Sequence, residues 1–286
     1  GGDAVSRVSF NQTSLEQVAD LHLETISNSV VWPNEATPVP DEVFGSNYLS
    51  VATGFLVPGR STGEVLITNV YSAEQFAIST RKSGYFYHRV EWLDMNGDGR
   101  LDALTARAKK HLLGGGTGEL LWLEQPADDR RKAWKEHVIA TGPDVHFIVA
   151  DLAGDGHPEI LATEFFGRQL KLLWSEGRAW KSRVLDDTLG NAFDLVLSDL
   201  NLDGRKDIVV TNHESGNGGA VLAYEVPDNY KVDSWPRHTL LSGIQVVSRS
   251  FNSAAPGAPV VWTPAEGGKP RILVGGDGSC KLHMIV

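Results

Sequence analysis

Three acidic segments of one pattern recur along the chain, and this repetition constrains the fold more than any other feature. The segments are Asp94–Asp102, Asp151–Glu159 and Asp199–Asp207. Each follows a short apolar run and precedes a second run rich in β-branched and aliphatic residues. A period of about 50 residues is typical of repeat proteins in which each copy is one supersecondary unit.

Two further markers repeat with the acidic segments. A third apolar run follows a glycine-rich turn in each copy, and a fourth run begins at Trp134, Trp180 or Trp235. Each copy therefore predicts four short strands, which we term A to D, with the acidic loop between A and B. Four-stranded units repeated along a chain indicate an all-β fold, a β-propeller of four-stranded blades.

Degenerate copies extend the series at both ends. Residues 48–52 and 63–69 resemble strands A and B without the acidic loop, and residues 259–263 and 268–275 resemble another pair. The sequence therefore predicts five blades, with six as the alternative, in a single domain over 1–286. The last copy stops after a third strand at 281–286, so we expect the N-terminal run 20–26 to close the ring. Residues 1–46 would form that closing strand and a long loop, and 47–286 the blades.

The acidic loops have the chemistry of a hard-cation site. Positions 1, 3, 5 and 9 carry oxygen side chains and position 6 is glycine, a pattern that suits calcium. An EF-hand would need Glu at position 12, where this chain has Thr105, Ala162 and Val210. Loop two has Ala153 at position 3, which lacks a side-chain oxygen, so a calcium site is less strongly predicted there. The candidate ligands are Asp94, Asn96, Asp98, Asp102, Asp151, Asp155, Glu159, Asp199, Asn201, Asp203 and Asp207.

These loops resemble those of the FG-GAP/VCBS family of calcium-binding β-propellers. The family includes the integrin α-subunit heads and, more distantly, the propeller of a fungal aldos-2-ulose dehydratase. The resemblance covers most of the chain from about Leu49 onward. It implies that calcium is structural and that the acidic loops lie on the face opposite the ligand face.

The opposite ends of the strands then hold the candidate site. Arg89, His146 and Asp194 lie five residues before the three acidic loops, so we expect them to converge at a channel mouth. A base, a carboxylate and a cation in one concave place suit acid–base chemistry. We predict as catalytic residues His146, His213, Glu164, Glu214, Arg89 and Asp194. We predict as substrate-binding residues Tyr85, Tyr87, His111, Phe147, Phe165, Arg168, Phe193 and Asn212. Asp144 lies at the same end and receives no role.

Composition excludes several classes of function. The net charge is −10, which argues against binding to nucleic acid or to anionic lipid. The sequence contains no run of 18 apolar residues, so no membrane span is predicted. No G-x-G-x-x-G follows a strand and no G-x-S-x-G occurs, so neither a nucleotide cofactor nor a serine hydrolase is expected. Zinc on His146, His213 and Glu164 has suitable ligand types but no supporting spacing.

The remaining class is a small-molecule enzyme that uses proton transfer: a lyase or dehydratase, an isomerase or a cyclase, acting on a sugar-derived or secondary metabolite. One alternative is a carbohydrate-binding lectin or adhesion module. A second is a cyclase or pericyclase that mainly orients an apolar substrate. The expected partner is therefore a small molecule or a carbohydrate. The sequon Asn11-Gln12-Thr13 favours secretion; without it the protein would be cytoplasmic.

Overall fold

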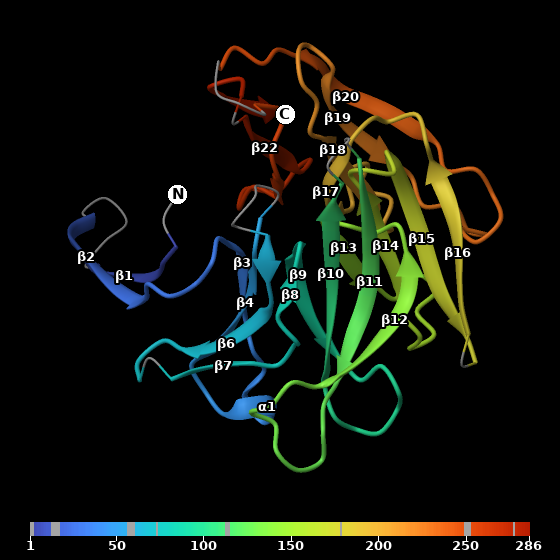
Figure 1. Ribbon diagram of the computed structural model, residues 1–286. Helices are drawn as coiled ribbons and strands as arrows, with labels where there is room; N and C mark the ends of the chain where they lie inside the picture. Colours follow the sequence, from blue (N-terminus) through green and yellow to red (C-terminus); the bar gives the residue numbers. More distant parts are fainter. Residues whose placement is uncertain are drawn as a thin grey trace. The chain divides into compact units, whose positions relative to one another are not determined.

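The structure, a computed structural model, describes residues 3–12, 18–55, 61–72, 74–111, 115–177, 179–248, 253–276 and 278–286. Thr13 of the sequon lies outside them. The chain divides into two compact units, Gly1–Thr141 and Gly142–Val286. The described residues are almost entirely strands and turns, with one short helix, α1 (Asp41–Phe44), in the first unit (Figure 1). The single domain over 1–286 stays a prediction.

The first blade is a four-stranded antiparallel sheet whose strands follow the order of the chain. They are β3 (Pro33–Pro38), β4 (Tyr48–Thr53), β6 (Val65–Asn69) and β7 (Gln75–Ala77). The run 48–52 is therefore the second strand and not the inner one, as the sequence suggested. Strand β3 takes the inner place, so this blade begins earlier than residue 47, and α1 occupies its A–B connection.

The second blade lies in the same unit and carries the first acidic loop. Its four main strands are β9 (Tyr85–Leu93), β10 (Asp102–Lys110), β11 (Gly116–Glu124) and β12 (Lys135–Thr141). Two short strands, β5 (Thr62–Gly63) and β8 (Lys82–Ser83), extend the sheet beyond β9. Strand β9 also packs against β3 and β4 of the first blade.

The N-terminal run 20–26 does not complete a blade, contrary to the expected closure. It belongs to β2 (Val18–Ser27), which pairs with β1 (Val5–Gln12) in a separate two-stranded sheet. The short connection between these strands makes this pairing local, and closing a short loop costs less chain entropy than a distant pairing.

The second unit holds three blades. The third is β13 (Phe147–Ala150), β14 (Glu159–Glu164), β15 (Gln169–Glu176) and β16 (Ala179–Asp186). The fourth is β17 (Ala192–Ser198), β18 (Asp207–Asn212), β19 (Gly219–Tyr224) and β20 (Arg237–Ile244). The fifth has three described strands, β21 (Pro259–Trp262), β22 (Arg271–Gly276) and β23 (Lys281–Ile285). The fold class is thus the predicted one, an all-β propeller fold of five blades.

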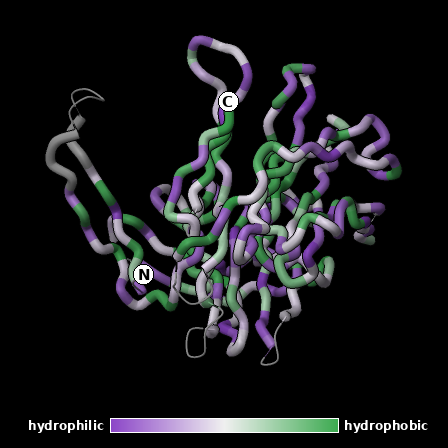
Figure 2. The backbone as a smooth tube through the Cα atoms, turned by 90° about the horizontal axis from the view of Figure 1, so that it is seen from above, coloured by the Kyte–Doolittle hydropathy of each residue, from purple (hydrophilic) through white to green (hydrophobic). Residues whose placement is uncertain are grey.

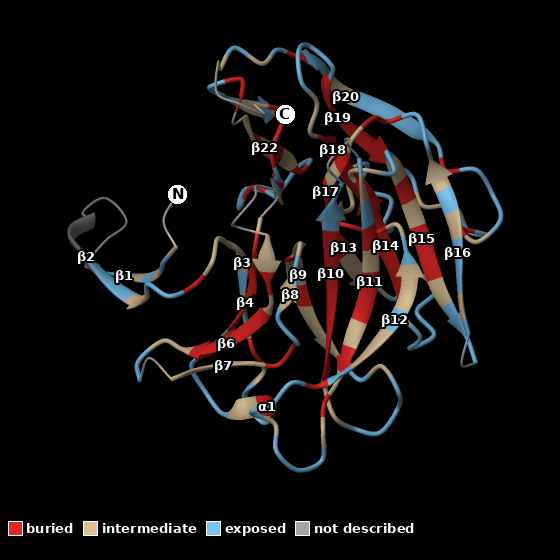
Figure 3. Cartoon of the chain, in the orientation of Figure 1, coloured by how far each residue is buried: buried red, intermediate tan, exposed pale blue. Residues whose placement is uncertain are grey.

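The core of each unit lies between the central strands of its blades. Buried residues run along β10, β11, β15 and β19, whereas the outer strands β16 and β20 are mostly exposed (Figure 3). Hydrophobic residues gather on the strands and hydrophilic ones in the connections (Figure 2). Trp134 and Trp235 are 3% and 7% exposed, and each indole N–H donates to a backbone carbonyl of its own turn. Trp134 and Trp235 are therefore core residues, whereas Trp180, for which the repeat predicts the same role, is only half-buried. No helix in the described part of the chain has the length and apolar character of a membrane span.

Candidate functional site

The second unit brings His146 and Asp194 together at one end of its inner strands. His146 immediately precedes β13 and Asp194 lies in β17, so the residues start equivalent strands of neighbouring blades. The His146 Nδ1 atom is 3.8 Å from Asp194 Oδ1, and both side chains are about nine-tenths buried or more. Asp194 Oδ1 also accepts the Leu195 backbone N–H at 2.8 Å.

Phe193 separates this pair from a second histidine. The Phe193 ring meets His146 edge-on at 5.1 Å and stacks on His213 at 4.7 Å. His213 Nδ1 is 3.0 Å from the Pro256 carbonyl oxygen. Because a carbonyl oxygen only accepts, we assign the proton to Nδ1, which leaves the Nε2 lone pair of neutral His213 available as a base.

The neighbouring loop adds two half-buried aromatic rings. Phe165 and Phe166 meet edge-on at 5.6 Å, and Phe165 lies 6.3 Å from His213. The loop is held by Asp144, whose two carboxylate oxygens accept the backbone N–H groups of Phe165 and Phe166 at 2.6 and 2.8 Å. Burial raises the pKa of Asp144 to about 7, helped by the nearby charge of Glu164 and opposed by the two N–H bonds.

Glu164 is enclosed by the chain itself. Its carboxylate forms an ion pair with Lys171 of β15, and both side chains are mostly buried. Gly142 and Gly167 border this carboxylate so closely that a Cβ atom at either position would overlap a Glu164 oxygen. The carboxylate therefore holds two turns together beneath the aromatic loop.

Glu214 occupies the corresponding place in the fourth blade. Its Oε1 atom accepts the Asn191 backbone N–H at 2.8 Å and lies 2.9 Å from Arg168. Gly190 borders this carboxylate as Gly142 borders Glu164. Asn212 Nδ2 donates to the carbonyls of Leu189 and Gly218, so the Asn212 side chain also joins two turns.

Two predicted substrate residues lie in the interior of their blades. Phe147 and Tyr87 are both 0% exposed. The Tyr87 hydroxyl accepts a bond from Arg107 at 3.2 Å, and burial raises the pKa of this phenol. Both side chains thus pack beneath the surface on which a ligand would lie.

The other predicted residues of the first unit form contacts with residues of their own unit. Arg89, at a φ of 36°, donates from Nε to both Glu35 carboxylate oxygens at 3.1 and 3.2 Å. His111 lies 3.4 Å from the Thr117 hydroxyl. Tyr85 faces two cations, with the guanidinium of Arg107 5.4 Å and the ammonium of Lys109 5.9 Å from its ring centre.

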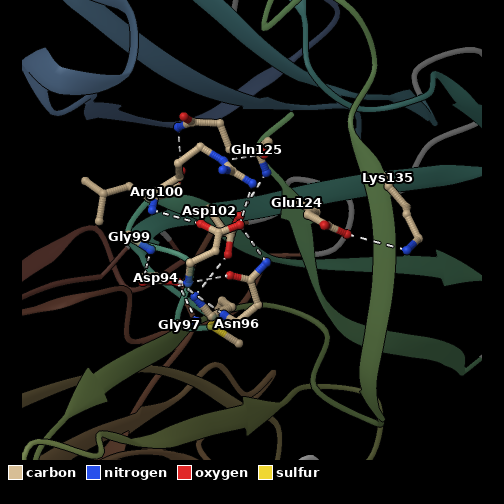
Figure 4. A network of polar contacts seen from close by, with 12 residues as sticks. Asp94, Asn96, Gly97, Gly99, Arg100, Asp102, Glu124, Gln125 and Lys135 are labelled. Atoms are coloured by element: carbon tan, nitrogen blue, oxygen red, sulfur yellow. Dashed lines mark hydrogen bonds and ion pairs between the residues drawn. The ribbon is translucent and has the colours of Figure 1, made fainter. Parts of the chain in front are cut away.

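The first acidic loop is a tight turn organised by its own carboxylates (Figure 4). Asp94 accepts the backbone N–H groups of Gly97 and Gly99 at 2.7 Å, one on each oxygen. These bonds lower the pKa of Asp94 despite partial burial. Asp102 is fully buried and accepts the N–H groups of Met95 and Gln125. Burial and the charges of Asp98 and Asp94 raise the pKa of Asp102 to about 6.

The other two loops share this frame but differ in their last carboxylate. In loop three, Asp207 accepts the Leu200 N–H, and burial together with the charge of Asp203 raises its pKa. In loop two, Glu159 accepts a bond from the Tyr230 hydroxyl at 2.7 Å and lies 3.2 Å from Lys231 Nζ.

The donor chemistry of loops one and three fits calcium. Their last carboxylates, Asp102 and Asp207, are buried and form no ion pair among the described residues, whereas Asp98 and Asp203 pair with Arg100 and Arg205 of the same loops. Loop two fits poorly, because Ala153 has no oxygen and Lys231 already balances Glu159. Among the described residues, no three His, Cys, Asp or Glu side chains gather closely enough to hold a metal as they stand. Binding would therefore require side chains of the loops to turn.

Within the second unit, the site formed by His146, Phe193 and His213 lies at the opposite end of the strands from the acidic loops. His146 precedes β13 and Asp151 follows it, and the same holds for Asp194 and Asp199 on β17. Sequence reasoning missed the roles of Asp144, Lys171 and Asn191, which hold the site's loops. Only the turn residues Gly142 and Gly190 before each inner strand could have pointed to such enclosed carboxylates.

Comparison with known proteins identifies no family for this chain. No protein-family model matches the chain, and no curated protein matches it significantly. Among solved structures, TolB from Acinetobacter baumannii matches with a TM-score of 0.46 and 12% identity, over 93% of this chain and 57% of that one.

Two further structures match in the same range. The V. cholerae biofilm matrix protein Bap1 has a TM-score of 0.43 and 15% identity, over 95% of this chain and 38% of its own. The intramolecular trans-sialidase from Ruminococcus gnavus, in complex with oseltamivir carboxylate, has a TM-score of 0.41 and 10% identity, over 98% and 56%. The chain thus spans about half the length of these proteins or less.

Proposed function

We propose that the second unit carries the site of a small-molecule enzyme that works by proton transfer, as a lyase or dehydratase, an isomerase or a cyclase. The observation that carries this proposal is the arrangement of His146, Phe193 and His213. One imidazole is paired with a carboxylate, the other is assigned its proton on Nδ1 so that Nε2 is its basic atom, and an aromatic ring lies between them.

The two histidines suit opposite halves of one reaction. His213 Nε2 takes a proton from the carbon next to a carbonyl, and the electron pair moves toward the carbonyl oxygen. In its imidazolium form, whose charge the Asp194 carboxylate 3.8 Å away would balance, His146 gives a proton to that oxygen or to a leaving hydroxyl. Where the first carbon carries a hydroxyl, return of the first proton to the former carbonyl carbon, together with passage of the hydroxyl proton back to His146, completes an isomerisation. Loss of a hydroxyl on the next carbon as water completes an elimination, after which His213 releases its proton to solvent. Neither path needs an oxidant or a nucleotide.

The aromatic rings favour a substrate with a ring or an extended apolar face. Phe165, Phe166 and Phe193 are half-buried and lie beside the histidines. A pocket of this kind fixes orientation with few polar groups. The same rings favour, as a second candidate, a carbohydrate-binding site, because sugar rings stack on aromatic faces.

A direct test is proton exchange at carbon. Dihydroxyacetone, a three-carbon ketose, is incubated with the full chain in D₂O, and exchange of its carbon-bound protons is followed by NMR. We expect exchange that saturates with ketose concentration. His213→Gln should lower the rate about 10²–10⁴-fold, the usual contribution of a general base.

The control is His238→Gln, which changes an exposed histidine of the outer strand β20 and should leave the rate unchanged. Exchange that does not saturate across a series of ketoses of three to six carbons, or that survives His213→Gln, would contradict the enzyme. Binding of several glycans on an array without exchange would instead support the carbohydrate-binding candidate.

For loops one and three we propose structural calcium, held by Asp94, Asn96, Asp98 and Asp102 and by Asp199, Asn201, Asp203 and Asp207. The proposal is supported by the donor types and by the uncompensated burial of Asp102 and Asp207. Calcium would supply charge balance to the turn and would take no part in the proton transfer.

A further inference from the structure

The second unit has a hollow that the proposed proton-transfer site does not use. Its volume is about 690 Å³, and it lies at the acidic-loop end of the third and fourth blades. Loop two, loop three and the turn between β19 and β20 form its walls. The lining residues that carry the argument are Leu152, Ala153, Leu197, Arg205, Lys206 and Val226.

The floor of this hollow is apolar. Leu152, Leu197 and Val226 are half-buried and pack on the core cluster of the unit, which includes Tyr230 and Trp235. Ala153 leaves space where loops one and three have an asparagine side chain. An apolar floor of this size accommodates one large side chain or a ligand of similar bulk.

The rim of the hollow offers one uncommitted cation. Arg205 is held by Asp228 and Asp203. The carboxylate of Asp151 is turned into its own loop, where it accepts the N–H groups of Asp155 and Gly156. Lys206 is exposed and forms no ion pair within the part of the chain that the structure describes. The hollow therefore complements an apolar group that stands next to a carboxylate.

The first unit shows what fills the corresponding place. The turns Pro126–Trp134 and Pro227–Trp235 have the same length and equivalent positions in their blades. In the first unit, α1 forms the A–B connection of the preceding blade and covers this turn. The Phe44 ring lies 6.0 Å from the Trp134 ring, and Arg130 donates to the carbonyls of Glu42 and Val43 at 3.2 and 2.9 Å.

In the second unit the preceding blade has only the short acidic loop two at this place, and among the described residues no helix covers the turn. We propose that the hollow docks a short peptide segment of a partner protein in which an acidic residue stands two positions before a large apolar one. The apolar side chain enters the hollow over Leu152 and Val226, and the carboxylate meets Lys206. The segment Asp41-Glu42-Val43-Phe44 of this chain has that chemistry and serves as the model.

The test uses a fluorescein-labelled peptide of residues 39–46 and the full chain, with binding followed by fluorescence anisotropy. We expect saturable binding of one peptide per chain. Lys206→Glu should weaken it about tenfold or more by placing like charges together. Ala153→Trp, which fills the hollow without changing its charge, should weaken it similarly. Lys181→Glu, an exposed lysine on β16, is the matched control and should change the affinity less than twofold.

A peptide with Ala in place of its phenylalanine should lose most of the binding. Absence of saturable binding to the unaltered chain, or equal binding by Lys206→Glu and Ala153→Trp variants whose melting curves match the parent, would overturn the proposal. Saturable binding of 3-phenylpropanoate without binding of the peptide would also overturn it, because the hollow would then serve a small molecule. The ketose-exchange assay should be unaffected by Lys206→Glu, so failure here is distinguishable from failure of the proposed function.

Discussion

Asp144 is the residue whose ionisation most directly affects the candidate site. Its pKa in the folded protein is about 7, well above the ordinary value of 3.8, because burial disfavours the charge. The neutral form therefore stabilises the fold fully below about pH 4, and this contribution is lost as the pH rises toward 7. The loss approaches at most about 1.4 kcal/mol per pH unit.

We accordingly expect the melting temperature to fall between pH 5 and pH 8, and to fall less in Asp144→Asn, which stays neutral. Thermal unfolding at four pH values in this range measures both slopes. Asp233→Asn, at an exposed position, should retain the parental slope. Parallel slopes for the parent and Asp144→Asn would refute the assignment.

Gly142 tests the enclosure of the Glu164 carboxylate. The residue has a φ of 118°, and a Cβ atom there would overlap the Glu164 carboxylate. Gly142→Ala should destabilise the fold by about 2–4 kcal/mol, the sum of backbone strain and a displaced buried ion pair. Gly177→Ala, at a φ of 65° with open space around it, should cost only about 1 kcal/mol. Denaturant unfolding compares the two, and equal costs would mean that the carboxylate moves freely.

At the scale of elements, the acidic loops differ in what balances their buried carboxylate. In loops one and three this carboxylate has no cation paired with it among the described residues. In loop two, Lys231 balances the charge of Glu159, and the Tyr230 hydroxyl donates a hydrogen bond to it. We expect millimolar calcium to raise the melting temperature and EDTA to reverse the rise, because a ligand of the native state stabilises by about 2.7 kcal/mol at one hundred times its Kd.

The calcium-dependent part of this shift separates the loops. It should shrink in Asp98→Ala and in Asp203→Ala and persist in Asp155→Ala. A melting curve that is indifferent to calcium and EDTA, or a shift that depends on Asp155, would contradict structural calcium in loops one and three.

The strands around the acidic loops were predictable because their signals are local. Each loop carries its turn residues in sequence, and each Trp lies within two residues of the start of the fourth strand of its blade. The approach of His146 to Asp194 was predictable as well, since equivalent positions on neighbouring inner strands lie side by side. The first blade was placed one strand out of step, because β3 begins and ends with proline and shows no alternation.

The contacts that enclose the carboxylates of Glu164 and Glu214 could not be predicted from the sequence. They depend on Lys171 one strand away and on glycines in turns that are distant along the chain. The tautomer of His213 likewise depends on the carbonyl of Pro256, more than forty residues away. Such contacts are products of tertiary packing, and residue patterns alone carry no trace of them.

For the molecule as a whole, the fifth blade is the place where association is expected. Leu282 and Met284 of β23 are 75% and 59% exposed, and Val260 of β21 is 58% exposed. The double substitution Leu282→Lys and Met284→Lys should reduce light scattering of concentrated solutions and leave the melting temperature nearly unchanged. Val184 and Val138, exposed on outer strands β16 and β12, supply a control pair of lysine substitutions with little expected effect.

In the described residues, the sheet of that blade ends at β23, and β23 pairs there with β22 alone. A strand with one unoccupied side presents a row of amide and carbonyl groups that any extended polypeptide can match. Wherever that side stays unpaired, polymerisation, capture by a chaperone and strand exchange between molecules can begin there, and a single proline or a charged cluster placed along β23 would prevent them.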